Sequence, residues 1–280
     1  MILATGAHGM LGGYFPGSVI KTDLPDMDIT NLDLVRSIFA QHSPKHVLHL
    51  AAWTDVDGAE NQEDAVFRTN AIGTLHVATA AREIGAELTY ISTTQVFDGT
   101  KTSPYTEFDP VCPVNVYAAG KCEGERIVRE TTPRHYIFRA GWMMGGGAKD
   151  HKFVGKIFDL LKTRDHIMAV DDNQGSPTYA KDLAAGIMGF IGTGLYGTYH
   201  MVNGGGTCSR YEMALEIARV VGSDTRIEAV TSDRFPLPAP RGANEGAVNY
   251  KLDLMERNPM RDWKSALQSY VREELLSGAR

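Results

Sequence analysis

Short apolar runs alternate with longer amphipathic stretches over the first half of the chain. Runs at residues 2–5, 19–22, 46–50, 88–92 and 135–139, with a shorter one at 28–30, predict buried strands. Helices are expected from Asn31, which suits a helix N-cap, through 41, over 70–84, and around Tyr117 up to 132. Strictly alternating strands and helices predict an α/β fold built on a Rossmann-type, doubly wound parallel sheet.

The pattern loosens after Gly145-Gly146-Gly147, a natural lobe boundary. Helices are expected at 153–161, 183–191 and 262–276, with strands at 167–170 and 199–202. A capping box, Ser209 with Glu212, opens a further helix that runs to 221. These elements predict a smaller C-terminal lobe beside the sheet.

A glycine-rich loop, Gly6-Ala7-His8-Gly9-Met10-Leu11-Gly12, follows the first expected strand directly. Glycines at this spacing let the backbone approach the pyrophosphate of a dinucleotide at a helix N-terminus, although a plain turn would look the same. Pro16-Gly17 shortens the following helix to about two turns, which leaves the anion-binding first turn in place. Asp23, seventeen residues after Gly6, could bind the adenosine ribose hydroxyls and repel a 2′-phosphate, which favours NADH over NADPH.

Candidate ligand-binding residues recur where the expected strands end. In a doubly wound sheet, ligands bind at the carboxyl ends of the strands. Gly9, Asp23, Ala51 and Thr93 all fall at such ends. This coincidence predicts that the four positions meet at one site.

Tyr117 and Lys121 lie four residues apart on an expected helix, so their side chains share one face. An ammonium beside a tyrosine favours the phenolate and eases proton transfer to or from an alcohol or ketone. The pair also arises often by chance, so the remainder of the chain must support it.

Composition excludes several classes of protein. With 280 residues, 43% hydrophobic and 22% charged, the chain has ordinary globular composition. A net charge of −6 without a basic block argues against nucleic acid as a partner, and no apolar run is long enough to cross a membrane. The N-terminus lacks the features of a signal peptide, and three cysteines without metal spacing indicate reduced thiols and a cytoplasmic protein.

The ordered set of motifs resembles the extended short-chain dehydrogenase/reductase superfamily, and most of all its dTDP-4-dehydrorhamnose reductase branch. The resemblance runs nearly end to end. It is carried by 5–12 (TGAHGMLG), 51–60 (AAWTDVDGAE), 70–74 (NAIGT), 91–93 (IST), 96–100 (VFDGT), 104–107 (PYTE), 113–117 (PVNVY), Phe138-Arg139 with Trp142, and 175–178 (GSPT).

The resemblance implies a role for each matching residue. Tyr117 would donate the proton, Lys121 would hold the nicotinamide ribose, and Thr93 would bind the substrate oxygen. Cofactor contacts would come from Gly6, Gly9, Met10, Leu11, Asp23, Asp28, Ile29, Ala51 and Ala52, and sugar or diphosphate contacts from Thr94, Trp142 and Arg241. An NAD(P)-binding domain would comprise 1–145 and 177–203, and a substrate-binding lobe 146–176 and 204–280.

The implied reaction is NADH- or NADPH-dependent reduction of the C4 ketone of a nucleotide-linked 4-keto-6-deoxyhexose, a step in dTDP-L-rhamnose biosynthesis, by a possible homodimer. The alternatives are another nucleotide-sugar reductase, an epimerase, and a non-catalytic regulatory subunit of methionine adenosyltransferase.

Two departures from the branch matter. Thr94-Gln95 replaces an Asp-Tyr pair that helps hold the sugar, which leaves the identity of the sugar open. A dehydratase of the superfamily needs an acid–base pair, commonly Asp-Glu, at these two positions, so dehydration is excluded. Tyr14 replaces a glutamate that takes part in a magnesium site between subunits, so no metal is expected.

Overall fold

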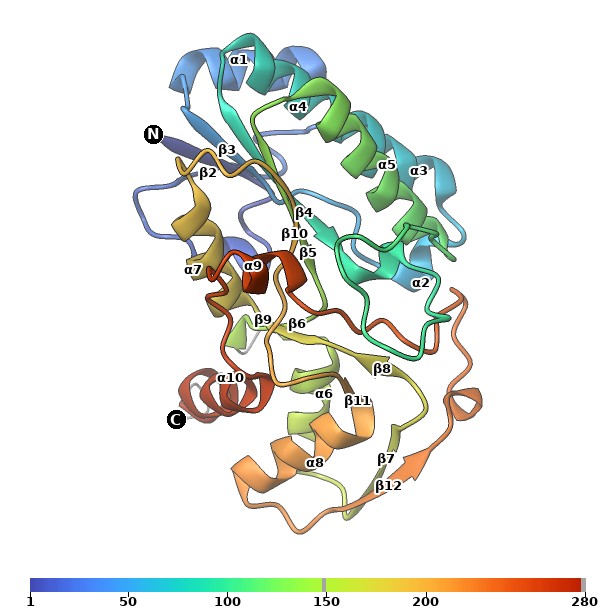
Figure 1. Cartoon of the computed structure of the whole chain (residues 1–280). Helices are drawn as coiled ribbons and strands as arrows, with labels where there is room; N and C mark the ends of the chain where they lie inside the picture. Colours follow the sequence, from blue (N-terminus) through green and yellow to red (C-terminus); the bar gives the residue numbers. More distant parts are fainter. Residues whose placement is uncertain (148–149, 278–280) are drawn as a thin grey trace.

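A six-stranded, wholly parallel sheet forms the upper part of the molecule (Figure 1). The computed structural model describes residues 1–147 and 150–277. The sheet has the order β10-β5-β4-β3-β1-β2. Its strands are β1 (Ile2–Thr5), β2 (Ile20–Lys21), β3 (His46–His49), β4 (Glu87–Thr93), β5 (His135–Ala140) and β10 (Gly197–His200). The predicted doubly wound α/β fold is confirmed.

The strand predicted at 28–30 is wrong. Asp28 accepts hydrogen bonds from the backbone N–H and the hydroxyl of Thr30, both at 2.8 Å, and this local turn replaces ladder bonds. The short apolar stretch is buried for another reason, because Ile29 packs against the helix at Gly73. The described sheet therefore ends at β2.

Helices cover both faces of the sheet because alternate strand residues point to opposite faces. Leu3 packs with α1 (Leu32–His42), α4 (Thr74–Glu83) and α5 (Val116–Thr131), whereas Ala4 packs with α7 (Ala180–Phe190). Two hydrophobic cores result, one on each face. Because helices bury both faces of the sheet, the strands read as continuous apolar runs in the sequence.

The lower part of the molecule carries its own hydrophobic cluster (Figure 1). Its strand pairs are β6 (Trp142–Met144) with β9 (Pro177–Tyr179), β7 (His166–Val170) with β12 (Arg226–Val230), and β8 (Gln174–Gly175) with β11 (Cys208–Ser209). Its helices are α6 (Phe153–Leu160), α8 (Arg210–Val221) and α10 (Trp263–Tyr270), while α2 (Val56–Ala59), α3 (Glu63–Phe67) and α9 (Tyr250–Leu254) are short connecting helices.

The domain boundaries stay a prediction. Met144 and Tyr179 lie inside the ranges assigned to the sheet domain, yet both pack in the lower cluster. The two parts of the molecule are thus joined through these residues.

Helix ends follow the expected local chemistry in two cases and depart from it in a third. Asn31 caps α1 by accepting from the N–H of Leu34, and Ser209 and Glu212 form the predicted capping box of α8. The glycine loop, by contrast, leads into a single 3-10 turn, Leu11–Tyr14, which is shorter than the predicted two-turn helix.

Among the described residues, no helix is long and apolar enough to cross a membrane.

Candidate active site

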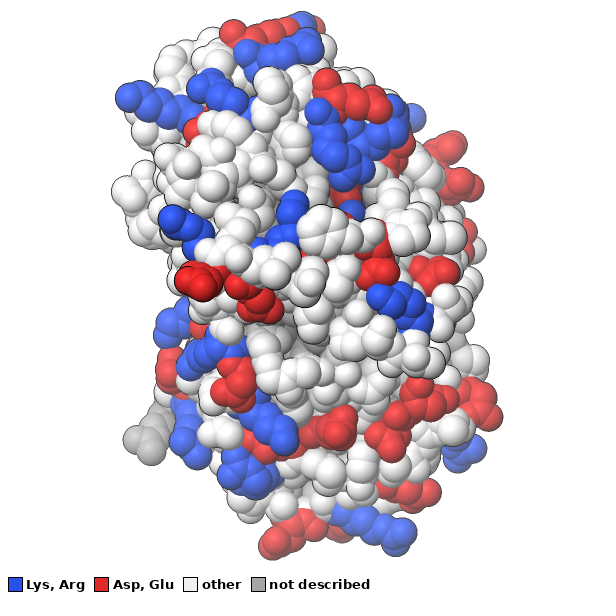
Figure 2. Space-filling model, in the orientation of Figure 1, with Lys and Arg blue, Asp and Glu red and all other residues white. Residues whose placement is uncertain are grey.

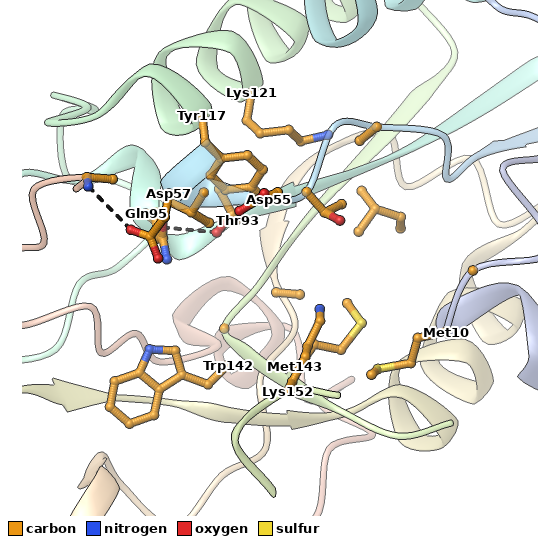
Figure 3. A pocket seen from close by; sticks show the side chains of 18 of the residues that line it. Met10, Asp55, Asp57, Thr93, Gln95, Tyr117, Lys121, Trp142, Met143 and Lys152 are labelled. Atoms are coloured by element: carbon orange, nitrogen blue, oxygen red, sulfur yellow. Dashed lines mark hydrogen bonds between the residues drawn. The ribbon is translucent and has the colours of Figure 1, made fainter. Parts of the chain in front are cut away.

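One cavity of about 1080 Å³ lies where the strands of the sheet end. Its wall includes Gly9 after β1, Asp23 after β2, Ala51 after β3 and Thr93 at the end of β4. The structure therefore brings together the four positions that the sequence placed at strand ends. Figure 3 shows Tyr117 and Lys121 on one side of the open space and Trp142, Met143 and Met10 on the other.

The glycine loop forms a close-fitting cradle at one end of the cavity. Gly6 has φ +64°, and a Cβ there would lie 2.5 Å from the Ala51 backbone. A Cβ on Gly12 would lie 2.1 Å from the carbonyl oxygen of Ala7. Only glycine fits these two positions, so the backbone can approach a dinucleotide pyrophosphate here, which is what the cofactor requires.

The backbone N–H groups expected to hold the pyrophosphate differ in their present bonds. That of Gly9 donates to the Gly6 carbonyl at 3.3 Å, so Gly9 would have to give up this long bond to bind an anion. Met10 and Leu11 follow it along the cavity wall. Because the next element is only a four-residue 3-10 turn, the helix dipole contributes less here than in a full helix.

Asp23, Asp28 and Ile29 line the same end of the cavity, as predicted for an adenosine site. The Asp23 carboxylate accepts from the backbone N–H of His8 and of Leu24, each at 2.8 Å. These bonds fix the carboxylate at the edge of the cavity while leaving lone pairs for ribose hydroxyls. Its negative charge opposes a 2′-phosphate.

Tyr117, Lys121 and Thr93 converge from α5 and the end of β4. Burial raises the pKa of Tyr117 to about 12, with hydrogen bonding to Thr93 acting in the opposite direction and the Glu245 carboxylate adding to the rise. This shift is opposite to the eased proton release expected from a neighbouring ammonium. The physical reason is that burial disfavours the phenolate. Burial also lowers the pKa of Lys121 to about 7, so the charged form of the lysine is itself disfavoured.

A buried ion pair lies behind Lys121. Lys121 is 3% exposed, and its Nζ stands 4.0 Å from the centre of the Tyr90 ring. One turn further along α5, Glu125 forms two hydrogen bonds, of 2.8 and 2.7 Å, with the guanidinium of Arg139. Burial alone would raise the pKa of Glu125, but Arg139 holds it below its usual range. The resulting carboxylate favours the charged form of Lys121.

Trp142 and Arg241 lie at the other end of the cavity, where the sugar and diphosphate contacts were predicted. The indole Nε1 of Trp142 donates to Glu245 at 2.7 Å. Arg241 pairs with Asp57 at 3.1 Å and also donates to the carbonyl of Ala239. Both side chains are therefore held in place by the protein itself.

The structure does not bring Thr94 to the cavity wall, and this corrects the prediction that it contacts the substrate. After Thr93 the chain enters a 3-10 turn, Thr94–Val96, which leaves Thr94 only 1% exposed and puts Gln95 on the wall instead. Where the backbone leaves a strand, the alternation of side chains between the two faces ends. The sequence alone therefore does not show which of two neighbouring residues faces the cavity.

A family model for the RmlD substrate binding domain matches residues 1–276 of the chain. This chain belongs to that family. A curated relative, the spore coat polysaccharide biosynthesis protein SpsK of Bacillus subtilis, is 35% identical over 97% of each chain. A solved structure of a dTDP-4-dehydrorhamnose reductase from Clostridium acetobutylicum superposes with a TM-score of 0.93 at 39% identity, covering 97% of this chain and 98% of that one.

A second RmlD-family structure is a dTDP-4-dehydrorhamnose reductase from Bacillus anthracis in complex with NADP. It superposes with a TM-score of 0.92 at 34% identity, covering 97% of this chain and 98% of that one. The predicted resemblance, and the prediction of an NAD(P)H oxidoreductase like dTDP-4-dehydrorhamnose reductase, are confirmed at the level of the RmlD family.

Arg210 and Glu245 are among the residues on the wall of this RmlD-family cavity that sequence reasoning missed, and Gln95 was named only as a departure from the branch. The Arg210 guanidinium lies 3.7 Å from the centre of the Trp142 ring, and burial lowers its pKa to about 10. Arg210 lies inside the predicted capping box between Ser209 and Glu212, and no sequence motif includes Glu245. Position along the sequence gave no signal, because both enter the site through tertiary packing.

Proposed function

We propose that the protein reduces the C4 ketone of a nucleotide-linked 4-keto-6-deoxyhexose with NADH or NADPH. The observation that carries the proposal is the convergence of Thr93, Tyr117 and Lys121 on a cavity that ends in the Gly6–Gly12 cradle. A proton donor thereby shares one space with a dinucleotide site. The proposed path is the synthesis of dTDP-L-rhamnose.

The residues of the chain divide the chemistry between them. Reduced nicotinamide, when bound, supplies the hydride that forms the new C–H bond at C4. Thr93 would hold the ketone oxygen, and the hydroxyl of Tyr117 would give its proton to that oxygen as the C=O double bond becomes a single bond. A pKa of about 12 keeps Tyr117 protonated at neutral pH, as a proton donor must be before the reaction.

Lys121 would hold the nicotinamide ribose and place positive charge beside the nascent oxygen. The ion pair of Glu125 with Arg139 supports this role, because a buried carboxylate one turn away favours the ammonium form. At the other end, Trp142 and Arg241 would contact the sugar and its diphosphate. Arginine suits phosphate because its planar donors match phosphate oxygens.

The cofactor preference is proposed to lie with NADH, on the ground of the Asp23 carboxylate. The relative from Bacillus anthracis is in complex with NADP, so both cofactors must be compared directly. The three free cysteines support a cytoplasmic location, and a homodimer is also proposed.

The decisive experiment follows the oxidation of NADH and of NADPH with dTDP-4-keto-L-rhamnose made in situ, using wild type and Tyr117→Phe. Loss of the proton donor should lower kcat by about 10²–10⁴-fold. With wild type, kcat/KM should be higher for NADH than for NADPH.

Tyr199→Phe is the matched control for this experiment. Tyr199 is buried in the sheet domain, its hydroxyl donates to the Leu195 carbonyl, and it lies away from the residues that line the cavity. Its kcat should stay within about twofold of wild type. Equal turnover by Tyr117→Phe and wild type would remove Tyr117 from the mechanism, and no turnover by wild type with either cofactor would overturn the proposed reaction.

A further inference from the structure

Glu245 is a nearly buried carboxylate at the sugar end of the cavity. It is 8% exposed, lines the cavity, and accepts from Trp142 Nε1 at 2.7 Å and from Gln95 Nε2 at 3.4 Å, both through Oε2. Its backbone is anchored, since its N–H donates to the carbonyl of Gln174 at 2.7 Å. A carboxylate that is held this firmly at a cavity wall keeps its second oxygen available to a ligand.

Gln95 adds a second acceptor beside it. The side-chain oxygen of Gln95 is buried and has no hydrogen-bond partner among the described residues. The orientation of this amide follows from Glu245, because only the NH₂ group can donate to a carboxylate. An unsatisfied buried acceptor costs free energy until a ligand donates to it.

Both groups adjoin the place where the ketone would react. The backbone N–H of Gln95 donates to the Thr93 hydroxyl at 3.2 Å, and the charge of Glu245 acts on Tyr117. Figure 3 shows Gln95 beside Thr93 and Tyr117 on the same side of the cavity. A sugar whose C4 oxygen meets Thr93 and Tyr117 would therefore present a carbon next to C4 to this pair.

We propose that Glu245 and Gln95 form a selectivity site that binds the hydroxyl on C3 of the 4-keto sugar. The inference rests on the proposed function. The two neighbours of C4 are C3 and C5. In a 6-deoxyhexose the C5 side carries a methyl group without a donor, whereas C3 carries a hydroxyl that can donate its one proton to either of these acceptors. Glu245 and Gln95 are specificity-determining residues in this proposal, and the proton and hydride transfers do not pass through them.

The test compares a nucleotide-linked 4-ketohexose with its 3-deoxy analogue in wild type, Glu245→Ala and Gln95→Leu. A site built to bind a hydroxyl rejects the analogue that lacks it, because buried polar groups are then left unpaired. Wild type should lose about 10²-fold or more in kcat/KM on the 3-deoxy analogue. In Glu245→Ala and in Gln95→Leu this loss should shrink to below about 10-fold, mainly through a poorer KM for the 3-hydroxy sugar.

Glu216→Gln is the matched control. Glu216 is 9% exposed, pairs with Arg219 and Gln268, and lies away from the residues that line the cavity. It should discriminate between the two sugars as wild type does. Wild-type discrimination in both Glu245→Ala and Gln95→Leu would overturn the proposal, and Gln95→Leu decides the matter should Glu245→Ala fail to fold.

Calorimetry separates this inference from the proposed function. The dissociation constants of the 3-hydroxy and 3-deoxy nucleotide sugars are measured without cofactor. Should wild type turn over neither sugar, the proposed reaction fails, while a preference for the 3-hydroxy sugar that disappears in Gln95→Leu still supports the selectivity site. Equal binding of the two sugars to wild type contradicts it.

Discussion

At the scale of single residues, the site uses burial more than charge pairing. Tyr117 is held protonated and Lys121 is destabilised as a cation, because both are removed from water. The spacing of the two residues was readable from the sequence, since four residues make one helical turn. Their pKa shifts were not, because these depend first on burial and then on Glu125 and Glu245, which come from another turn of α5 and from a distant segment.

The depressed pKa of Lys121 predicts a pH-dependent stability. With a folded pKa of about 7 and an unfolded value near ~10.4, the unfolded chain binds more protons between these limits, so this residue's contribution to stability rises with pH across that window. Without cofactor, Lys121→Met should unfold with a free energy about 1–4 kcal/mol higher than wild type at pH 7. The difference should shrink as the pH approaches 10.

Urea unfolding at pH 7, 8.5 and 9.5 measures this effect. Lys181→Met serves as the control, because Lys181 is an exposed lysine paired with Glu273. Its difference from wild type should remain small and constant. A difference in the free energy of unfolding between Lys121→Met and wild type that does not change with pH would contradict the lowered pKa of Lys121.

At the scale of elements, α5 is the helix on which the site depends. Asn115 caps it by accepting from the N–H of Ala118 at 2.8 Å, and the same side chain donates to the Pro240 carbonyl at 3.1 Å. The cap therefore also ties the helix to the 231–241 segment on the cavity wall. One residue positions the catalytic face and the substrate-side segment together.

Asn115→Ala should cost about 1–2 kcal/mol in the free energy of unfolding and raise KM for the nucleotide sugar. The first effect comes from the lost cap and the second from release of the segment at Pro240. Urea unfolding measures the change in stability, and steady-state kinetics measures the change in KM. Asn31→Ala removes a comparable cap from α1 and should lower stability without changing KM; a similar rise in KM in both variants would show that the contact with Pro240 is unimportant.

The strands and helices were largely predictable, because buried parallel strands read as apolar runs and caps have local signatures. The exceptions are informative. Asp28 and Thr30 form a side-chain turn that competes with a ladder, and Thr94 turns inward at a 3-10 turn. Gln95 and Glu245 meet although they are 150 residues apart, which no local pattern encodes.

At the scale of the whole molecule, Tyr14 joins the two parts of the chain. Its ring packs against both the upper and the lower core, its hydroxyl donates to Glu274 at 2.6 Å, and that hydroxyl accepts from the N–H of Gly146 at 2.7 Å. Burial and the carboxylate of Glu274 raise the pKa of Tyr14, so it stays a donor at neutral pH. The residue that replaces the branch's glutamate thus makes a contact within the chain.

Tyr14→Phe should lower the free energy of unfolding by about 1–3 kcal/mol, because Gly146 and Glu274 each lose a partner. Denaturant unfolding measures the change. Tyr250→Phe, at an exposed position, should be neutral. Overlapping unfolding curves for Tyr14→Phe and wild type would show that this contact does not hold the two parts together.

The face shown in Figure 2 carries acidic and basic side chains interspersed over both parts of the molecule. Within the cavity, Glu245 comes from a different segment than the reacting groups, whereas Gln95 lies in the turn that follows Thr93. Thr93, Tyr117 and Lys121 belong to the rigid sheet and to α5, whereas Glu245 stands in an irregular segment.

This separation has a consequence for how the protein can diverge. One fold can carry sites for different substrates, because substrate choice depends on a few side chains carried by the scaffold. Descendants of this chain could therefore exchange one sugar for another by changes around Glu245, while inheriting the reaction unaltered. The reaction of such a protein would still reveal its ancestry, whereas its choice of substrate would not reveal it.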